Sequence, residues 1–205
     1  RGVLYVGTGQ NYSSPADDGS DAIIAMDLKT GSIRWKRQLQ GRDAWNVACG
    51  VPVLTTNCPE EDGPDFDFGA PPMLVTGSEG RELIIAGQKS GMVYALDPDQ
   101  SGQMVWLRRL GRGGILGGVH WGMAADDEAI YVPISDADLL GRVFPGEPNP
   151  SISKVSIDTG ELIWQTAVDF ECEGIKGCRN GLSAAVTLID GAVIAPGLDG
   201  VIYAY

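Results

Sequence analysis

The stretch Ala22–Trp35, AIIAMDLKTGSIRW, decides the fold because it recurs along the chain. Val93–Trp106 reads VYALDPDQSGQMVW, Ile152–Trp164 reads ISKVSIDTGELIW, and a fourth copy begins with VIYAY at Val201. Each complete copy has a short strand pattern with β-branched residues, a turn that contains Asp and Gly, and a return strand that ends in Trp. A unit repeated in this way predicts a repeat architecture in which each copy packs against its neighbours.

The turn of each copy has the residues that a tight connection between two strands requires. An Asp near the start can accept hydrogen bonds from backbone amides one or two residues on. A Gly near the end can adopt a positive φ angle without a Cβ penalty. We expect these roles for Asp27, Asp97 and Asp158, and for Gly31, Gly102 and Gly160.

A Trp closes each return strand, at Trp35, Trp106 and Trp164. A Trp at one fixed place of every unit predicts a packing residue between neighbouring units, and this reading is favoured over stacking on a cofactor. Replacement of such a Trp by Ala should lower the free energy of unfolding by about 3–5 kcal/mol.

Composition indicates a globular, turn-rich chain. Of 205 residues, 43% are hydrophobic and 20% are charged, with 29 Gly and 12 Pro. No long segment shows helical periodicity, so we predict an all-β fold. No apolar run is long enough to cross a bilayer. The formal net charge of −12 argues against a nucleic-acid partner, because phosphate binding needs a basic face.

The spacing between successive turn glycines exceeds the length of a four-stranded propeller blade, which is about 40–50 residues. Long loops must therefore separate the copies, and functional residues tend to lie in such loops. We predict one partial propeller domain over residues 1–205. The chain begins at Arg1 inside a strand pattern without an initiator Met and ends inside a repeat, so we expect an internal fragment. Further expected elements are strands at residues 1–10, Pro72–Thr76, Glu82–Gly87, Ala129–Pro133, Ala184–Ile189 and Ala192–Ala195, and a loop at 136–150.

Four cysteines are present, at Cys49, Cys58, Cys172 and Cys178. Their even number favours two local disulfides, Cys49–Cys58 and Cys172–Cys178, and thus an oxidising compartment. Zinc is the alternative, less favoured because no Cys-x-x-Cys occurs and the chain has a single histidine.

Two loops attract attention for their composition. Asn57–Gly69 has five carboxylates, which predicts a surface loop and, as the weaker alternative, a cation site. Within it, Asp65-Phe66-Asp67-Phe68 alternates, so an extended backbone would place both rings on one side and both carboxylates on the other. Gly111–Gly118 is rich in glycine, but it lacks the ending of a phosphate-binding loop and no helix pattern follows it.

The recurring Ala-x-Asp-x-x-Thr-Gly-x-x-x-Trp resembles the repeat of dehydrogenases that depend on pyrroloquinoline quinone (PQQ), which are eight-bladed β-propellers. The strings SDAIIAMDLKTGSIRWKRQLQGRDAWNVACG, NCPEEDGPDFDFGAPP and AGQKSGMVYALDPD look most like the polyvinyl-alcohol dehydrogenase branch. The resemblance covers essentially the whole chain and implies about three to four consecutive four-stranded blades. The repeat alone also occurs in non-catalytic scaffolds and sensor domains, so the strings between the repeats favour the enzyme.

The resemblance implies a site for Ca²⁺ and a catalytic base. A Gly-Thr-Gly-Asn corner supplies a Ca²⁺ ligand in the family, and here Gln10 or Asn11 takes that place, since amide oxygens suit Ca²⁺. An ordinary turn role is the alternative for Asn11. The family's base lies in Asp-x-Trp-Asp, which here reads Asp43-Ala44-Trp45-Asn46. Asn46 cannot accept a proton at neutral pH. Asp43 is therefore the expected base, with a surface role as the alternative, and Asn46 a polar positioning group or Ca²⁺ ligand.

The resemblance also implies residues that bind PQQ. Lys89 falls where the family has a cation on the quinone oxygens, a role that stabilises developing charge. His120 and Trp121 fall where the family has Asn-Trp at the rim of the cofactor. Trp121 is outside the set of repeat tryptophans, and the alternative for His120 is a polar residue without a ligand.

The implied activity is oxidation of an alcohol, of a secondary alcohol or of polyvinyl alcohol. Ca²⁺ would polarise the quinone, a carboxylate would take the hydroxyl proton, and the electrons would pass to a cytochrome c. Any haem c would belong to another domain or to a partner, because no Cys-x-x-Cys-His occurs in this chain. The implied location is periplasmic or secreted. The alternative function is a binding propeller without catalysis, either a scaffold or a ligand sensor, and Gln10 and Asn46 favour it.

Overall fold

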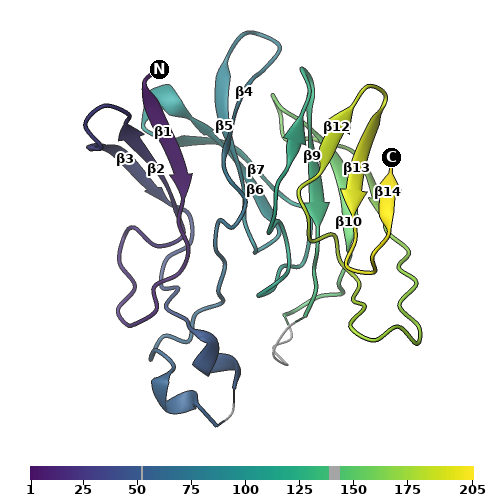
Figure 1. Ribbon diagram of the computed structural model, residues 1–205. Coiled ribbons are helices and arrows are strands. Elements are labelled where there is room, and N and C mark those ends of the chain that lie inside the picture. The colour runs from purple at the N-terminus through teal and green to yellow at the C-terminus, as the bar shows by residue number, and fades with distance from the viewer. Residues whose placement is uncertain (52, 139–143) are drawn as a thin grey trace.

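The computed structural model describes residues 1–51, 53–138 and 144–205, and these residues form four antiparallel sheets that stand side by side (Figure 1). Each sheet is a meander of strands that are consecutive in the sequence. The first comprises β1 (Val3–Gly7), β2 (Ala22–Asp27) and β3 (Ile33–Gln38), and the second β4 (Met73–Thr76), β5 (Glu82–Gly87), β6 (Met92–Asp97) and β7 (Gln103–Arg109). The third comprises β8 (Ala124–Ala125), β9 (Ala129–Ile134), β10 (Ser151–Ser156) and β11 (Leu162–Ala167), and the fourth β12 (Thr187–Ile189), β13 (Ala192–Pro196) and β14 (Ile202–Ala204).

The all-β prediction is confirmed for the described part of the chain, where the helices are three short 3₁₀ turns. These are η1 (Val47–Gly50), η2 (Thr55–Asn57) and η3 (Pro98–Gln100). None of the described helices has the length and apolar character needed to cross a bilayer. The expected strands are found, although β12 is shorter than expected because Val186 N already donates to Gly122 O at 3.1 Å. The loop expected at 136–150 lies partly outside the described residues.

Apolar cores fill the space between consecutive sheets. Between the second and third sheets, Ile85 and Val93 pack in one cluster with Ile130 and Val155. Similar clusters join the first sheet to the second and the third to the fourth. The middle strands are thus covered on both faces, which explains the continuous apolar sequence of β9, AIYVPI, every residue of which is buried.

Trp35 and Trp106 dock one sheet on the next, as predicted. A Cβ atom at Gly102 would lie 2.7 Å from the Trp35 ring, and one at Gly160 would lie 2.6 Å from the Trp106 ring. Trp106 Nε1 also donates to Ile157 O at 2.8 Å. A β-bulge follows the residue paired with each Trp in all three hairpins, so the strand distortion repeats with the sequence.

The repeated turns have the expected positive φ, 72° at Gly31, 69° at Gly102 and 69° at Gly160. Asp27 Oδ1 accepts from Lys29 N and Thr30 N, both at 3.0 Å, as predicted for the turn Asp. The prediction for Asp158 is wrong. Its carboxylate instead accepts from Ser78 Oγ at 2.6 Å in the neighbouring sheet, while Ser156 O accepts from Gly160 N at 3.0 Å and closes the turn.

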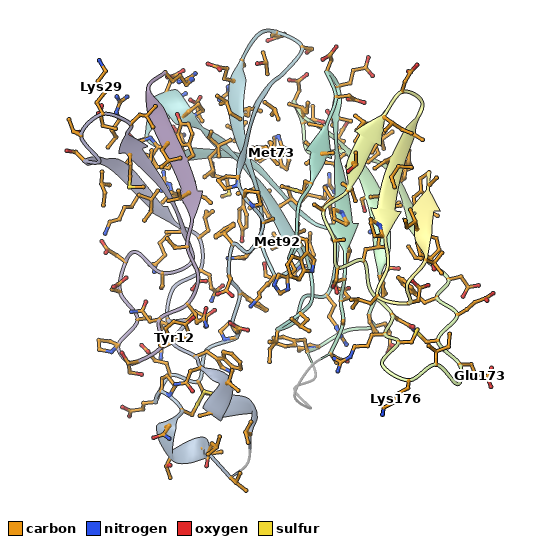
Figure 2. The ribbon with its side chains drawn as sticks, viewed as in Figure 1. Tyr12, Lys29, Met73, Met92, Glu173 and Lys176 are labelled. Atoms are coloured by element: carbon orange, nitrogen blue, oxygen red, sulfur yellow. A yellow bond between two sulfur atoms is a disulfide. The ribbon has the colours of Figure 1, made fainter. Side chains whose placement is uncertain are left out.

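The sheets have two unlike ends (Figures 1 and 2). The turn end has the three repeated turns at residues 27–33, 97–103 and 156–162, and Figure 2 shows Lys29 there. The loop end has the long connections at residues 8–21, 39–72, 110–123, 144–150 and 168–186, with Tyr12, Glu173 and Lys176 marked in Figure 2. The predicted disulfides Cys49–Cys58 and Cys172–Cys178 are both formed at the loop end, so the zinc alternative is wrong for these cysteines.

Candidate functional site

Lys89 is the centre of a buried ionic cluster at the loop end. Its turn, between β5 and β6, places Nζ 3.0 Å from Asp65 Oδ2 and 2.5 Å from Asp67 Oδ2. The side chain of Lys89 is 7% exposed, that of Asp65 3% and that of Asp67 21%. Burial would lower the pKa of Lys89, but the two carboxylates outweigh it and raise that pKa. Lys89 is therefore a fixed cation with Asp67 as the more accessible of its partners.

Asp43 organises the chain segment that supplies these carboxylates. It is completely buried, and its two oxygens accept from Asp65 N at 3.0 Å and from Phe66 N at 2.7 Å. Burial raises the pKa of Asp43, while the two amides oppose that rise. The backbone around Asp65 is held in a positive φ of 63°, which places the carboxylates of Asp65 and Asp67 together on Lys89.

The Gly-Thr-Gly-Gln corner joins the same cluster. Gln10 N donates to Asp67 Oδ1 at 2.9 Å, so Asp67 links the corner to Lys89. A side chain at Gly9 would place Cβ 2.4 Å from Asp67 Oδ1, so this close approach requires glycine. Asn11 N donates to Asp43 O at 2.9 Å, and its side-chain Oδ1 accepts from Asp17 N at 3.4 Å. Both predicted metal ligands thus border the carboxylate cluster.

Asp21 is a site residue that the sequence did not single out. It is completely buried at a positive φ of 46°, and neither carboxylate oxygen has a hydrogen-bond partner among the described residues. Burial and the nearby charges of Asp43, Asp67 and Asp65 raise its pKa to about 8. The pKa of Asp65 is raised to about 7, by burial above all and against the attraction of Lys89. The cluster therefore has two carboxyl groups that hold protons near neutral pH.

His120 and Trp121 lie next to the cluster as a stacked pair. Their ring centroids are 4.7 Å apart with 7° between the planes. A Cβ atom at Gly69, two residues after Asp67, would lie 2.8 Å from His120 O. Burial and the charge of Lys89 lower the pKa of His120 to about 4, so the imidazole is neutral at pH 7. Its Nδ1 is buried and has no partner within the described residues, while Trp121 is 44% exposed.

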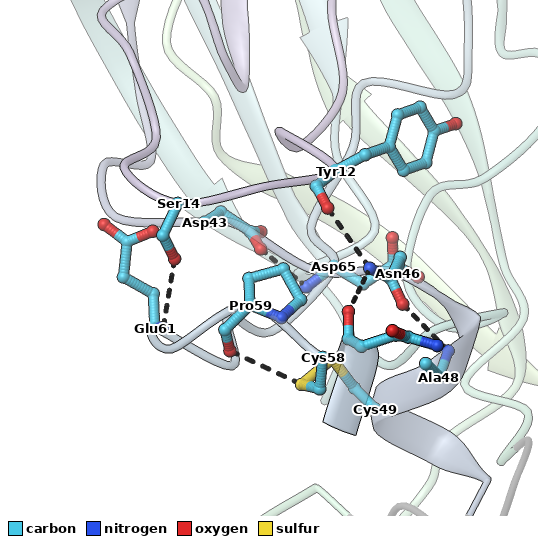
Figure 3. The surroundings of a disulfide bond; sticks show 11 residues. Tyr12, Ser14, Asp43, Asn46, Ala48, Cys49, Cys58, Pro59, Glu61 and Asp65 are labelled. Atoms are coloured by element: carbon cyan, nitrogen blue, oxygen red, sulfur yellow. Dashed lines mark hydrogen bonds between the residues drawn. A yellow bond between two sulfur atoms is a disulfide. The ribbon is translucent and has the colours of Figure 1, made fainter. Parts of the chain in front are cut away.

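Asn46 lies apart, at the start of the loop closed by the Cys49–Cys58 disulfide (Figure 3). Its Oδ1 accepts from Ala48 N at 2.9 Å and caps η1. Its Nδ2 donates to Tyr12 O at 3.1 Å and to Asn57 O at 3.0 Å. The whole amide of Asn46 therefore serves the loop closed by the disulfide.

The donor set fits a divalent cation and an anionic cofactor. Four buried or half-buried aspartates, Asp21, Asp43, Asp65 and Asp67, surround a single ammonium group, so the cluster is rich in potential oxygen ligands. Carboxylate and amide oxygens are ligands of Ca²⁺. Lys89 uses two hydrogens on carboxylates and keeps a third, and the unpaired His120 Nδ1 is a further polar atom that a ligand could satisfy.

The structure unites most, but not all, of the predicted residues. Gln10, Asn11, Asp43 and Lys89 meet around Asp67, with His120 and Trp121 beside them. The missed residues are Asp21, Asp65 and Asp67. The alternation Asp-Phe-Asp-Phe drew attention to the last two, but residues 65–68 form no strand, and the positive φ of Asp65, not an extended backbone, brings both carboxylates to Lys89. Asp21 has no such signal in its local sequence.

A cavity of about 690 Å³ lies away from the residues of the Lys89 cluster. It is lined by Trp164 of the third sheet and by Leu188, Val193 and Tyr205 of the fourth. Trp35 and Trp106 have a turn glycine of the next unit against their rings, whereas Trp164 borders this cavity. The residues that line this cavity belong to the contact between the third and fourth sheets and not to the ionic cluster.

No protein-family model matches the chain. A polyvinylalcohol dehydrogenase from a Pseudomonas species is 40% identical over 202 residues, which are 98% of this chain and 30% of that protein. A polyvinylalcohol dehydrogenase from a Sphingopyxis species is 37% identical over 204 residues, which are 98% of this chain and 31% of that protein. The chain thus spans about a third of the length of these curated relatives.

Among solved structures, a quinohemoprotein alcohol dehydrogenase from Pseudomonas putida HK5 superposes with a TM-score of 0.62 at 13% identity. The match covers 100% of this chain and 37% of that one, and at this identity it shows the fold alone. The four docked sheets therefore form a segment of a β-propeller of the quinoprotein type. With the sequence relatives, the chain belongs to the PQQ-dependent dehydrogenase family, with similarity to polyvinylalcohol dehydrogenases along nearly all its length.

Proposed function

We propose that this chain forms part of the cofactor and substrate site of a PQQ- and Ca²⁺-dependent alcohol dehydrogenase. The observation that carries the proposal is the Lys89 cluster, in which Asp67 links a buried cation to the Gly-Thr-Gly-Gln corner. A lone turn lysine without a function would not need two buried carboxylates, since burial of charge is costly unless function or close pairing compensates it.

Each residue has a defined part in this proposal. Lys89 would donate to the quinone oxygens, and His120 would orient a cofactor carboxylate while Trp121 covers the rim. Gln10 and Asn11 would offer amide oxygens to Ca²⁺, next to the carboxylate of Asp67. When bound, PQQ with Ca²⁺ would supply the acceptor for the hydride of the alcohol, and the two electrons of that hydride would leave one at a time to a cytochrome c.

The proton of the alcohol needs a carboxylate, and Asp43 is our proposed base. Its complete burial and its bonds to Asp65 N and Phe66 N equally support a positioning role, in which it holds the segment that carries Asp65 and Asp67. The two roles differ in the effect of Asp43→Asn. Loss of a base would lower kcat with cofactor affinity kept, whereas loss of a positioning group would weaken cofactor binding and kcat together.

Asn46 takes a place that the family gives to a carboxylate, and its amide is committed to the η1 loop. We propose a positioning role for Asn46.

The two disulfides support a periplasmic or secreted location, because such bonds persist in oxidising compartments.

The test is a titration of the full-length protein with PQQ and Ca²⁺, followed by dye-linked oxidation of a secondary alcohol. We expect saturable PQQ binding that requires Ca²⁺, and turnover only with both. Absence of quinone binding at micromolar cofactor would overturn the proposal and favour the alternative of a binding propeller without catalysis.

Lys89→Gln should abolish turnover. The control is Lys176→Ala, at an exposed lysine in the loop closed by the Cys172–Cys178 disulfide, and it should leave turnover unchanged. Because Lys89→Gln leaves two carboxylates unpaired, a Lys89→Gln/Asp65→Asn variant separates loss of fold from loss of function. Turnover retained in a folded Lys89→Gln protein would remove Lys89 from the site.

A further inference from the structure

The glycine-rich segment, residues 111–118, lies between the second and third sheets in the sequence and packs against the turn that carries Lys89. Gly114 N donates to Lys89 O at 3.1 Å. A Cβ atom at Gly118 would lie 2.3 Å from Lys89 O, and one at Gly113 would lie 2.9 Å from the same atom. The glycines therefore allow a close backbone approach to the Lys89 turn, which is the role of a motif that lacks the ending of a phosphate-binding loop.

Asp136, two residues after the end of β9, holds this segment in place. Its side chain is buried, and Oδ1 accepts from Gly113 N at 3.0 Å and from Gly118 N at 3.1 Å. Oδ2 accepts from Arg112 N at 2.8 Å and from Asn149 N at 3.1 Å. Hydrogen bonds to a charged acceptor are stronger than those between neutral groups. One carboxylate therefore fixes both the start and the end of the glycine-rich segment.

The Lys89 turn lies between two supports, each held by a buried aspartate. On one side, Lys89 N donates to Asp67 O at 3.0 Å, in the segment that Asp43 organises. On the other side, Lys89 O accepts from Gly114 N, in the segment that Asp136 holds. Since a flexible side chain is held in one place only when its surroundings are fixed, both supports act on the position of the Lys89 ammonium group.

Asp136 differs from a buried aspartate that only closes a turn. Asp97, at the turn end of β6, accepts from Asp99 N and Gln100 N, two and three residues on. The four amides bound by Asp136 are 13 to 24 residues away in the sequence. Asp136 thus gathers separate segments of chain next to the Lys89 cluster, whereas Asp97 stabilises its own hairpin.

We propose that Asp136 is a positioning residue of the site. It holds the glycine-rich segment against the Lys89 turn and thereby keeps the Lys89 ammonium group between Asp65 and Asp67. The part of Lys89 in binding a quinone rests on the proposed function, whereas the hold of Asp136 on Lys89 needs no cofactor. The two can therefore fail separately.

The first test labels the lysine amines of the full-length protein with acetic anhydride and reads each lysine by mass spectrometry. Lys89 should react slowly in the parent, because its side chain is buried between two carboxylates. In Asp136→Asn the new amide group faces backbone donors, so Lys89 should react about tenfold faster, the effect of losing one hydrogen bond to a charged acceptor. An equal rate at Lys89 in the parent and in folded Asp136→Asn would overturn the proposal.

The matched control is Asp97→Asn, at a buried aspartate that also binds two backbone amides. It should leave the labelling of Lys89 unchanged. An equal increase at Lys89 in both variants would show a general loosening of the fold and would also overturn the proposal.

If Asp136→Asn does not fold, hydrogen exchange of the parent protein at low urea decides. The amides of Gly113 and Gly118, bound to Asp136, should open together with the amides of Gly114 and Lys89, at one free energy and with one dependence on urea. Opening of the Lys89 amide at a lower free energy than the amides bound to Asp136 would contradict the proposal.

A titration with PQQ in the presence of Ca²⁺ tests the consequence for the cofactor. The Kd for PQQ should rise about tenfold in Asp136→Asn, a loss typical of groups that orient a binding residue. In the Lys89→Gln/Asp65→Asn background, Asp136→Asn should cause no further rise, because its effect passes through Lys89. An equal rise in both backgrounds would overturn the proposal. A parent that binds no PQQ, with Lys89 still exposed by Asp136→Asn, would reject the proposed function and support the hold of Asp136 on Lys89.

Discussion

The turn end and the loop end of the same sheets use carboxylates in different ways. At the turn end, Asp27 bonds to amides two and three residues away and an arginine seven residues away. At the loop end, Lys89 meets Asp65 and Asp67 across 24 and 22 residues, and Asp43 meets Phe66 across 23. At the turn end Asp27 is half-buried, whereas Asp21 and Asp43 at the loop end are completely buried.

The difference teaches where stability and function reside. The turn end repeats because each unit must close its hairpin and dock on the next. The loop end does not repeat, and it has the buried charges, the neutral imidazole of His120 and the stacked, exposed Trp121. Strongly shifted pKa values in a cluster of this kind are typical of functional sites.

The largest expected effect comes from replacing a tryptophan of the repeat and a tryptophan of the loop end, and comparing the loss of stability. Trp106→Ala should lower the free energy of unfolding by about 3–5 kcal/mol, because the ring fills the space over Gly160 and binds Ile157 O. Trp121→Ala should lower it by about 1 kcal/mol or less, since that ring is exposed and stacks on one neighbour. Thermal and urea unfolding of both variants measure this contrast, and equal losses would remove the distinction between the two ends.

The second effect tests how tightly a Trp ring packs against a turn glycine of the next unit. Gly31 and Gly160 have nearly equal positive φ angles, but only Gly160 has a Trp ring against it. Gly31→Ala should therefore cost about 1 kcal/mol, the penalty of the left-handed backbone alone. Gly160→Ala should cost roughly 1–3 kcal/mol more, because the new methyl group overlaps Trp106. Similar midpoints of unfolding for the two variants would show that the Trp106 ring moves aside without a loss of stability.

The third effect is a pH dependence that belongs to the loop end. The folded pKa of Asp21 is raised to about 8, whereas an unfolded aspartate titrates near 3.9. Between those values the folded state keeps a proton that the unfolded state has lost, so stability from this group falls as the pH rises toward 8. His120 acts in the opposite sense, with a pKa lowered to about 4, so its contribution is lost as the pH falls from about 6.5 toward 4.

Asp21→Asn should therefore flatten the decline of the unfolding temperature between pH 6 and pH 9. The slope is the readout, because the new amide adds a constant offset at every pH. Asp27→Asn, at a half-buried turn carboxylate whose pKa is lowered, is the control and should not change this slope in the same range. A parallel decline in the parent protein and in Asp21→Asn would show that Asp21 is not the titrating group.

Several features of the chain followed from its sequence because their causes are local. The strands at Glu82–Gly87 and Ala192–Pro196 come from short apolar runs, and the positive φ of Gly31 comes from the turn itself. The short spacing of the cysteines was enough to predict both disulfides. Even here the local rule failed once, because Asp158 bonds to Ser78 of the adjacent sheet and not to its own turn.

The sequence by itself determined a repeated all-β unit, docked through Trp35 and Trp106, and it marked Lys89, Asp43 and Gln10 as candidates. The repeated unit depends on periodicity and on bonds between near neighbours, which a single stretch of chain contains, whereas the three candidates came from the resemblance to PQQ-dependent dehydrogenases. Only the tertiary structure decided that Asp21, Asp65 and Asp67 lie around the same cation, and that the rings of Phe66 and Phe144 meet. Burial and charge interaction depend on distance in space, and residues 22–24 positions apart in the sequence come together only when the sheets have packed.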